Sequence, residues 1–497
     1  MAISEVPARR SATYALLLAL GFILLTRLWR LPAAGLLNYD AVTDWQTVLG
    51  LAHGNGQLLF HHASPGFGLL FAPLAWLTSD YRVFQVANAV VGVASLGIFG
   101  HFVSQAGKLG PAATAAVVLL AGTSLLLTSS GRDFTENTCS LGAASGLLAA
   151  YYRRLHTHQP ADLLRAAAWL TLGLCFSFKL LFMVPVLLVL EWWAADGLLG
   201  QRGTWWRVLA IVAAPYVVLG AVGVLVGLPW FRWPAIYYRS IFPEETNLAG
   251  NQAKIHLEPF FYLRYLLDFE PALLIGLVVG LVGWARPAWW QRGKALALAP
   301  YLLVWAVCLL LGLSVLAKAP RALLFACGPL AALLVMGLRR LLPAWAANVG
   351  LLGSLGLNLF SLQREVFSRQ TTHYPEVVAW LRTHQARHIA TTAGIGIMPF
   401  LDKNQVATLI NSEHQLAALR RQGYQYVLLD SYWRPTNIAQ FDSLRRQRPV
   451  AAWPEPQLTA PLLFLEHAEY TGLSYDQSLA HQRLAAQDTV QLRLYRL

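Results

Sequence analysis

Charged side chains are scarce in this chain. They make up 13% of its 497 residues, whereas hydrophobic residues make up 56% and the mean hydropathy is +0.47. A soluble domain usually carries roughly 25% charged residues. The deficit excludes an ordinary soluble protein and predicts an integral membrane protein.

Cysteine is rare as well, and nucleic-acid-binding features are missing. The four cysteines lie in or beside apolar runs without CxxC or other metal-ligand spacing, so we expect small buried hydrophobic residues. The chain has a formal net charge of +13 but no basic stripe with interleaved aromatic residues. We therefore predict no nucleic-acid partner and attribute the charge to topology and contact with anionic membrane lipids.

Long apolar runs recur from residue 14 to residue 362, most of them about 15–25 residues long, which suits helices that cross a lipid core of about 30 Å. About eleven transmembrane helices are predicted: 14–28, 83–104, 111–128, 138–151, 163–176, 180–194, 207–228, 271–285, 295–316, 321–338 and 343–362. The shorter run 65–78 predicts a helix lying in the membrane interface. We expect the first run to stay as an anchor, because many spans follow it.

Basic residues mark one side of the membrane. The loops predicted on that side hold Lys108, Arg153, Arg154, Arg202, Arg207, Arg286, Arg292, Lys294, Arg339 and Arg340 with few acids. The positive-inside rule places these loops and the N-terminus in the cytoplasm, most simply of a bacterial inner membrane. The outer side then holds a first loop, 29–82, and a large loop, 229–270.

Polar composition returns after residue 362. Residues 1–362 form the predicted transmembrane module, and residues 363–497 form a predicted small α/β domain outside the cytoplasm. In this domain the pattern predicts helices at 375–384 and 412–423 and strands at 386–392 and 424–430.

Two acids, Asp40 and Asp44, follow the first span. From Thr43 onward the apolar residues recur at helical spacing, which predicts an amphipathic helix at the membrane surface. An acid at a helix start can also be a simple cap, but a cap explains one acid more readily than two spaced i, i+4.

Three further segments place charged residues at the same outer boundary. They are SSGRDFTEN with Arg132, Asp133 and Glu136, CFSFKLLF with Lys179, and KAPRALLF with Lys318 and Arg321. Charges so close to hydrocarbon usually face a cavity or a partner, although a single Lys or Arg can also extend toward the interface. A carboxylate can take a proton from an attacking hydroxyl, and Arg and Lys can hold a phosphate as it departs. A phosphate carried on a membrane lipid would suit this location.

The order of these segments resembles that of integral-membrane glycosyltransferases that use polyprenyl-phosphate sugars. These include the protein O-mannosyltransferases, the lipid A aminoarabinose transferases and the Rgt-like sugar transferases. Asp40 in NYDAVTDW matches their first-loop catalytic acid, and Gly54 closes the helix that follows. HHASPGF (61–67) is similar to their H-P-P-L element through Pro65.

The later motifs continue the resemblance. Arg132 lies in a segment similar to the family's S-R-x-x-x-P/D-x element, and Lys179 matches its T-K element. Lys318 and Arg321 resemble the K-x-x-R segment, with Ala322 where the family has an aromatic residue.

The resemblance implies a glycosyltransferase C fold and an inverting transfer of a hexosyl or pentosyl group to a lipid, glycan or protein acceptor. It implies Asp40 as the general base, with Asp44 beside it. The implied phosphate-binding residues are Arg132, Lys179, Lys318 and Arg321. No organic cofactor is expected, and a divalent metal with Asp133 and Glu136 as ligands stays open.

Other site candidates come from the outer loops. They are His61, His62, Tyr238, Arg239 and His256. The large loop 229–270 is rich in aromatic residues, which fit a membrane-anchoring belt as well as a substrate lid.

Three other classes of function remain as alternatives. An oligosaccharide ligase or polymerase that uses diphosphate-linked donors would share both chemistry and location. A lipid-linked sugar transporter would predict charges near the bilayer middle and an internal repeat, and we find no repeat in the sequence. A protein that merely displays the C-terminal domain would need fewer spans and no acid–base cluster.

Overall fold

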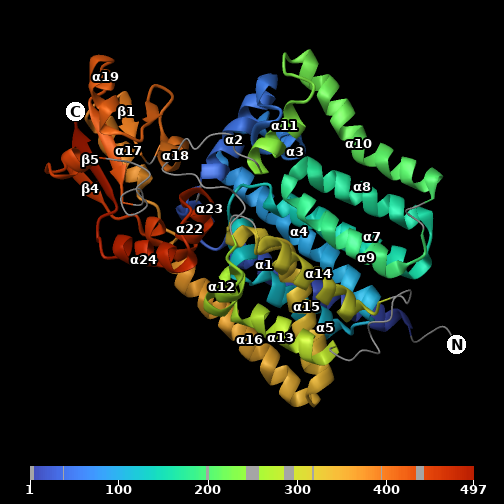
Figure 1. The fold of residues 1–497 in the computed structure, drawn as a ribbon. Helices are drawn as coiled ribbons and strands as arrows, with labels where there is room; N and C mark the ends of the chain where they lie inside the picture. Colours follow the sequence, from blue (N-terminus) through green and yellow to red (C-terminus); the bar gives the residue numbers. More distant parts are fainter. Residues whose placement is uncertain are drawn as a thin grey trace.

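The structure is a computed structural model that describes residues 5–36, 39–197, 201–241, 257–284, 296–315, 318–392, 394–431 and 441–497. A bundle of helices forms the larger part, and a smaller part that contains a sheet lies against one end of it (Figure 1).

The bundle follows the apolar runs of the sequence. Its helices are α1 (Glu5–Leu28), α2 (Tyr39–Ala52), α3 (Pro65–Ala75), α4 (Tyr81–Gly107), α5 (Pro111–Gly122), α6 (Leu125–Arg132), α7 (Asn137–Thr157), α8 (Pro160–Phe176), α9 (Val184–Ala194), α10 (Arg202–Leu225), α11 (Arg232–Ile241), α12 (Phe261–Phe269), α13 (Pro271–Trp284), α14 (Leu298–Leu313), α15 (Leu324–Leu341) and α16 (Ala344–Glu365). Short 3₁₀ helices include η3 (His61–Ala63), η4 (Phe178–Met183) and η7 (Pro320–Leu323). Each of the eleven predicted spans coincides with one or two of these elements.

Fewer helices than the predicted eleven are long and apolar enough to cross a membrane by a criterion of length and hydropathy. By length and hydropathy, five helices of the described residues qualify, or seven if each of two bent pairs counts as one span. The pairs are α5 with α6, bent by 67°, and α12 with α13, bent by 119°. The count of eleven stays a prediction.

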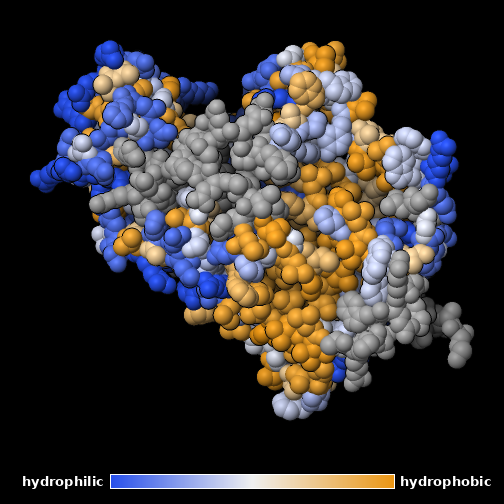
Figure 2. All heavy atoms as spheres, in the orientation of Figure 1, coloured by the Kyte–Doolittle hydropathy of each residue, from blue (hydrophilic) through white to orange (hydrophobic). Residues whose placement is uncertain are grey.

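Apolar side chains cover the outside of the bundle. Figure 2 shows hydrophobic residues over the helical part and mainly hydrophilic residues over the sheet-containing part. Large apolar side chains such as Leu18, Leu225 and Leu352 are each more than two-thirds exposed. Such a surface is compatible with lipid and not with water, which identifies an integral membrane protein.

Small residues let the helices pack closely inside the bundle. Gly276 of α13 faces the main chain of α15, and a Cβ at this position would overlap the carbonyl oxygen of Leu330. Glycine and other small residues are typical of helix contacts in membranes, because packing there replaces the hydrophobic effect as the force that joins helices.

The C-terminal part contains one five-stranded sheet in the order β2-β1-β3-β5-β4. The strands are β1 (His388–Thr391), β2 (Val406–Leu409), β3 (Tyr426–Asp430), β4 (Ala451–Trp453) and β5 (Leu492–Arg496). Strand β1 pairs in parallel with β2 and β3, whereas β5 pairs antiparallel with β3 and β4. The predicted strands 386–392 and 424–430 correspond to β1 and β3.

Helices accompany this sheet along the chain. They are α17 (Tyr374–Thr383), α18 (Gly394–Ile397), α19 (Leu416–Arg421), α21 (Asp442–Arg445), α22 (Pro461–Glu466), α23 (Ala468–Thr471) and α24 (Tyr475–Ala486). The predicted helix 412–423 is divided in the structure into a 3₁₀ helix, Glu413–Gln415, with a capping box at Ser412, and α19, which ends before Gly423, whose φ of +88° favours glycine. The location of this part outside the cytoplasm stays a prediction.

Hydrogen bonds join the C-terminal part to the bundle. The backbone N–H of Thr372 donates to the carbonyl of Ala33 at 3.0 Å, and Nε2 of Gln457 donates to the carbonyl of Ala34 at 2.7 Å. On another side, the Tyr475 hydroxyl donates to Oδ2 of Asp268 at 2.8 Å. The C-terminal part is thereby fixed beside the start of α2, where the predicted catalytic acids lie.

The contact between α13 and α15 generates a prediction about stability. We expect Gly276→Val to lower the free energy of unfolding of the purified protein by roughly 1–3 kcal/mol and its unfolding temperature accordingly, because the added side chain overlaps the backbone of α15. The matched control is Gly353→Val on α16, where no described atom of another element lies within 4 Å of the added Cβ. Equal unfolding temperatures for the two variants in detergent would contradict the packing described.

Candidate active site

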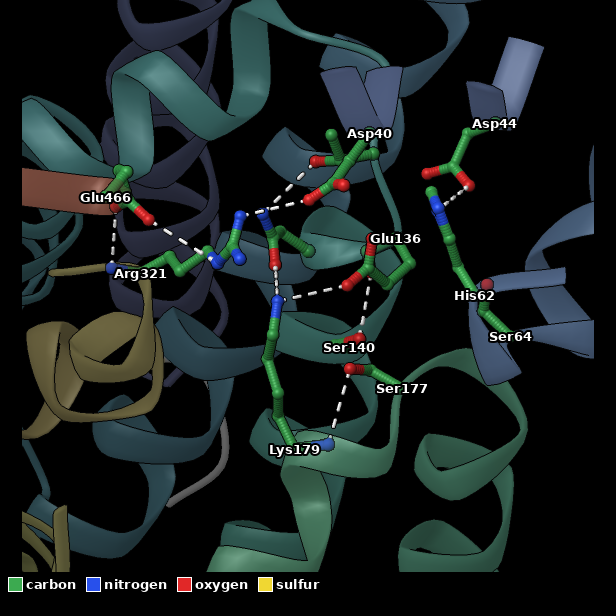
Figure 3. Close-up of polar contacts among 12 residues, drawn as sticks. Asp40, Asp44, His62, Ser64, Glu136, Ser140, Ser177, Lys179, Arg321 and Glu466 are labelled. Carbon is green, nitrogen blue, oxygen red and sulfur yellow. Dashed lines mark hydrogen bonds and ion pairs between the residues drawn. The ribbon is translucent and has the colours of Figure 1, made fainter. Parts of the chain in front are cut away.

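Charged side chains from separate elements converge at the end of the bundle next to the C-terminal part. Figure 3 shows them pointing toward one another. They are Asp40 of α2, Glu136 before α7, Lys179 of η4, Arg321 of η7 and Glu466 of α22. We call these five residues the charged cluster.

Asp40 lies in the first turn of α2, and its carboxylate is paired. Nη1 of Arg321 donates to Oδ2 of Asp40 at 2.9 Å. Burial acts to raise the pKa of Asp40, but the charge of Arg321 and smaller contributions from His62, Lys179 and His467 outweigh it and lower the pKa below its usual value. Asp40 is therefore ionised at neutral pH, as a base must be.

Lys179 owes its position to the break between α8 and α9. Ser177, the residue before η4, is extended, with φ −157° and ψ 135°. Its hydroxyl accepts a hydrogen bond from the backbone N–H of Lys179 and thereby caps the start of η4. The Lys179 ammonium then reaches Oε1 of Glu136 at 3.0 Å and Oδ1 of Asn137 at 3.2 Å. Both charged side chains of the pair are 13% exposed, so the contact is shielded from bulk water.

Arg321 lies between two carboxylates. Besides the contact with Asp40, its Nε is 3.4 Å from Oε2 of Glu466, and its backbone N–H donates to Oε1 of Glu466 at 2.8 Å. The sequence does not predict Glu466, because the segment LFLEHAEY carries no recognisable motif and lies 145 residues from Arg321.

Asp44, one turn after Asp40 on α2, and the two histidines form a second polar group next to the charged cluster. Nδ1 of His62 is 3.2 Å from Oδ1 of Asp44, and the rings of His61 and His62 stack with centroids 4.1 Å apart. His62 has a φ of +50°, which is uncommon for a residue other than glycine. The predicted pair of histidines is thus brought to Asp44 rather than to Arg321.

A cavity of about 260 Å³ opens beside this second group. Its lining residues are Gln57, Phe60, His61, His62, Arg232 and Ile236. Burial lowers the pKa of His61 to about 4, with the charge of His62 acting in the same direction, so the His61 ring is neutral at physiological pH.

Arg132 and Asp133 do not join the charged cluster. The Arg132 guanidinium is buried, and it donates to Gln370 and to three carbonyls at the end of α1, those of Thr26, Arg27 and Trp29, at 2.8–3.3 Å. The carboxylate of Asp133 is buried and accepts from the backbone N–H of Phe134. In place of the expected phosphate contact, Arg132 satisfies carbonyls that a helix end leaves without partners.

The remaining predicted residues are Lys318, Tyr238, Arg239 and His256. Lys318 is buried, which lowers its pKa to about 8, and the charge acting against this shift is that of Glu258. Tyr238 is exposed on α11. The side chain of Arg239 and the whole of His256 lie outside the described residues.

The acids that the structure describes in this region do not form a metal site. Among the described residues, no three or more His, Cys, Asp or Glu side chains are arranged to hold a metal ion. Glu136 contacts Lys179, and Asp133 faces the backbone, so the suggested pair of ligands does not fit a metal ion here.

Comparison with known proteins gives a likeness in structure alone. No protein-family model and no curated protein matches the chain. ArnT from Cupriavidus metallidurans in the apo state has a TM-score of 0.56 at 13% identity, covering 89% of this chain and 96% of ArnT. ArnT bound to undecaprenyl phosphate has a TM-score of 0.54 at 12% identity, covering 88% and 96%.

A third similar structure is the archaeal oligosaccharyltransferase AglB from Archaeoglobus fulgidus, solved with an inhibitory peptide and a dolichol-phosphate. Its TM-score is 0.49 at 12% identity, covering 85% of this chain and 70% of AglB. The likeness to ArnT, an aminoarabinose transferase, confirms the glycosyltransferase C fold predicted from the sequence.

The Asp44–His62 pair predicts a pH-dependent stability. Burial raises the pKa of Asp44 to about 7, against the hydrogen bond from His62. Burial opposes the charged form of His62, but Asp44 outweighs it and the pKa of His62 is raised. Asp44 therefore binds its proton more tightly in the folded than in the unfolded protein, so this stabilisation is fully present below the ordinary carboxyl pKa of about 4 and is lost as the pH rises from there through about 7.

We therefore expect this contribution to lower the unfolding temperature of the wild type as the pH rises from about 4 to about 7. Asp44→Asn keeps the size of the side chain but does not titrate, so its unfolding temperature should change less over the same range. A control is Asp162→Asn, which removes a buried carboxylate far along the chain, in α8. A wild-type curve parallel to that of Asp44→Asn would contradict the assignment.

Proposed function

We propose that this protein is an inverting glycosyltransferase that moves a sugar from a polyprenyl-phosphate carrier to a lipid, glycan or protein acceptor at the outer face of the membrane. One observation carries the proposal. An ionised carboxylate, Asp40, contacts the cation Arg321, and a second cation, Lys179, belongs to the same cluster at the end of an apolar bundle.

Asp40 supplies the base. As the acceptor hydroxyl oxygen bonds to the anomeric carbon, Asp40 takes the hydroxyl proton, and the bond between that carbon and the phosphate oxygen breaks. The electron pair of the broken bond stays on the phosphate. Because the acceptor attacks opposite the leaving group in a single displacement, the configuration at the anomeric carbon is inverted.

Arg321 and Lys179 supply the stabilisation of the leaving group. The phosphate of the donor is a diester with one negative charge, and it becomes a monoester with a second charge as it leaves. Cations that contact its oxygens therefore bind the transition state more strongly than the donor, which is the requirement for catalysis. Arg presents a planar set of donors that suits phosphate oxygens, and Lys adds a point charge.

The surroundings of the cluster support a lipid-linked donor. The apolar surface of the bundle gives a polyprenyl chain access from the membrane (Figure 2). The shared fold with ArnT, one structure of which holds undecaprenyl phosphate, points in the same direction.

The first prediction concerns the base. We expect Asp40→Asn to lower sugar transfer by roughly 10²–10⁴-fold, the usual contribution of a general base, with normal folding. The assay follows release of polyprenyl phosphate from synthetic polyprenyl-phosphate sugars by purified protein. The matched control is Asp402→Asn, which removes an exposed carboxylate paired with Arg382.

Other outcomes of this assay would redirect the proposal. Full activity of Asp40→Asn would contradict its role as the base. Turnover of diphosphate-linked donors alone would identify an oligosaccharide ligase or polymerase. Movement of the intact donor across a vesicle membrane without cleavage would identify a transporter.

The second prediction concerns pH. Because the charge of Arg321 lowers the pKa of Asp40, Arg321→Gln should raise that pKa and move the acid limb of the pH–rate profile to higher pH. The residual rate of this variant will be low, since the phosphate also loses a partner. The control Arg264→Gln removes an exposed arginine that pairs with Asp476 and should leave the acid limb in place. An unshifted acid limb in Arg321→Gln would contradict the coupling.

A further inference from the structure

Glu466 is the one member of the charged cluster that comes from the C-terminal part of the chain. It is the last residue of α22, whereas the other four members belong to the bundle (Figure 3). The predicted motifs do not include it, and the reaction steps above do not use it.

The two oxygens of Glu466 hold different parts of Arg321. Oε1 accepts the backbone N–H at 2.8 Å, and Oε2 is 3.4 Å from Nε on the inner side of the guanidinium. The opposite side, at Nη1, contacts Asp40 at 2.9 Å. Glu466 thus contacts the backbone N–H and Nε of Arg321, while Nη1 at the end of the side chain faces the predicted base.

The backbone contact stabilises the start of η7. Arg321 is in the first turn of this short helix. Ala319, the residue before the first residue of the helix, has no polar side chain that could accept a hydrogen bond from Arg321. An N–H at a helix start needs an acceptor from elsewhere. Glu466 provides it from 145 residues away, so the local structure of η7 depends on α22.

Glu466 is itself held in place by packing. The preceding residue, Leu465, is fully buried in the main hydrophobic core of the bundle, and Phe464 is buried against Ala485 of α24. The carboxylate of Glu466 is 17% exposed, as is the side chain of Arg321. A contact between groups this shielded, on anchored elements, differs from a surface ion pair, which contributes little.

We propose that Glu466 is a positioning residue, through which the C-terminal part holds Arg321 so that its tip can exchange the Asp40 carboxylate for the donor phosphate without the side chain moving away. This inference rests on the proposed function. Asp40 must release Arg321 to some extent when it accepts a proton, and Glu466 keeps the arginine in place during that step.

Two variants separate the parts of this role. Glu466→Gln keeps an oxygen that can accept the Arg321 N–H but loses the charge. Glu466→Ala loses both. Asp476→Asn is the matched control, because it removes another carboxylate that links the C-terminal part to the bundle, by way of exposed Arg264, away from the cluster.

The first measurement does not depend on activity. We expect hydrogen exchange at the backbone amide of Arg321 to be faster in Glu466→Ala than in the wild type, and close to the wild type in Glu466→Gln and Asp476→Asn. Unchanged protection in Glu466→Ala would overturn the proposal, because the contact would not hold η7.

The second measurement uses the transfer assay. We expect Glu466→Ala to lower kcat/KM for the polyprenyl-phosphate sugar on the order of tenfold or more, because Arg321 is misplaced. Glu466→Gln should recover most of the rate, and its acid limb should move to lower pH, since a negative charge near Asp40 is removed. A purely structural role would lower yield or stability in both variants and leave the pH profile unchanged, which would overturn the proposal.

Failure of the proposed function gives a different pattern. Wild-type protein could turn over no polyprenyl-phosphate sugar while hydrogen exchange at the Arg321 amide still becomes faster in Glu466→Ala. That result would confirm the contact but contradict both the proposed function and the positioning role of Glu466 in catalysis. If the wild type is active and Glu466→Ala matches it in rate and pH profile, only the positioning role falls.

Discussion

The arrangement of the site depends on one guanidinium shared by two carboxylates. Arg321 joins Asp40 from the start of the chain to Glu466 from near its end, and all three side chains are largely shielded from water. In such surroundings the loss of one partner costs more than the loss of a fully exposed pair. The three elements α2, η7 and α22 therefore have to be in place together.

The members of the charged cluster that come from the bundle share a structural setting. Asp40 is in the first turn of α2, Glu136 precedes the first residue of α7, and Lys179 and Arg321 lie on 3₁₀ helices that precede α9 and α15. Helix starts expose backbone N–H groups and lie where apolar helices leave the bundle. Polar side chains can leave the hydrophobic interior at these points without a buried unpaired charge, so the site forms at the ends of otherwise apolar elements.

The sequence predicts elements well where a single local pattern determines them. Apolar runs locate the helices of the bundle, and the VLL run locates β3. The order of motifs also selects Asp40, Lys179 and Arg321, which the structure brings together. The order of motifs does not separate Arg132, whose guanidinium donates to carbonyls at the end of α1, from the residues of the charged cluster, and it does not include Glu466. Both depend on contacts between residues more than 100 positions apart, which neither hydropathy nor spacing records.

In the proposed reaction Arg321 lies between the base and the phosphate, and this position has a consequence for the charge of the site. When Asp40 accepts the proton of the acceptor it loses its negative charge, and at the same time the departing phosphate gains one. The total charge in contact with the cluster is therefore constant, and only its location changes. An arginine that faces both groups can shift its hydrogen bonds from carboxylate to phosphate as the charge moves, with little reorganisation, provided that its stem is fixed. Glu466 lies at the backbone N–H and Nε of Arg321, so it fixes the inner part of the side chain without competing with Asp40 or the phosphate for Nη1.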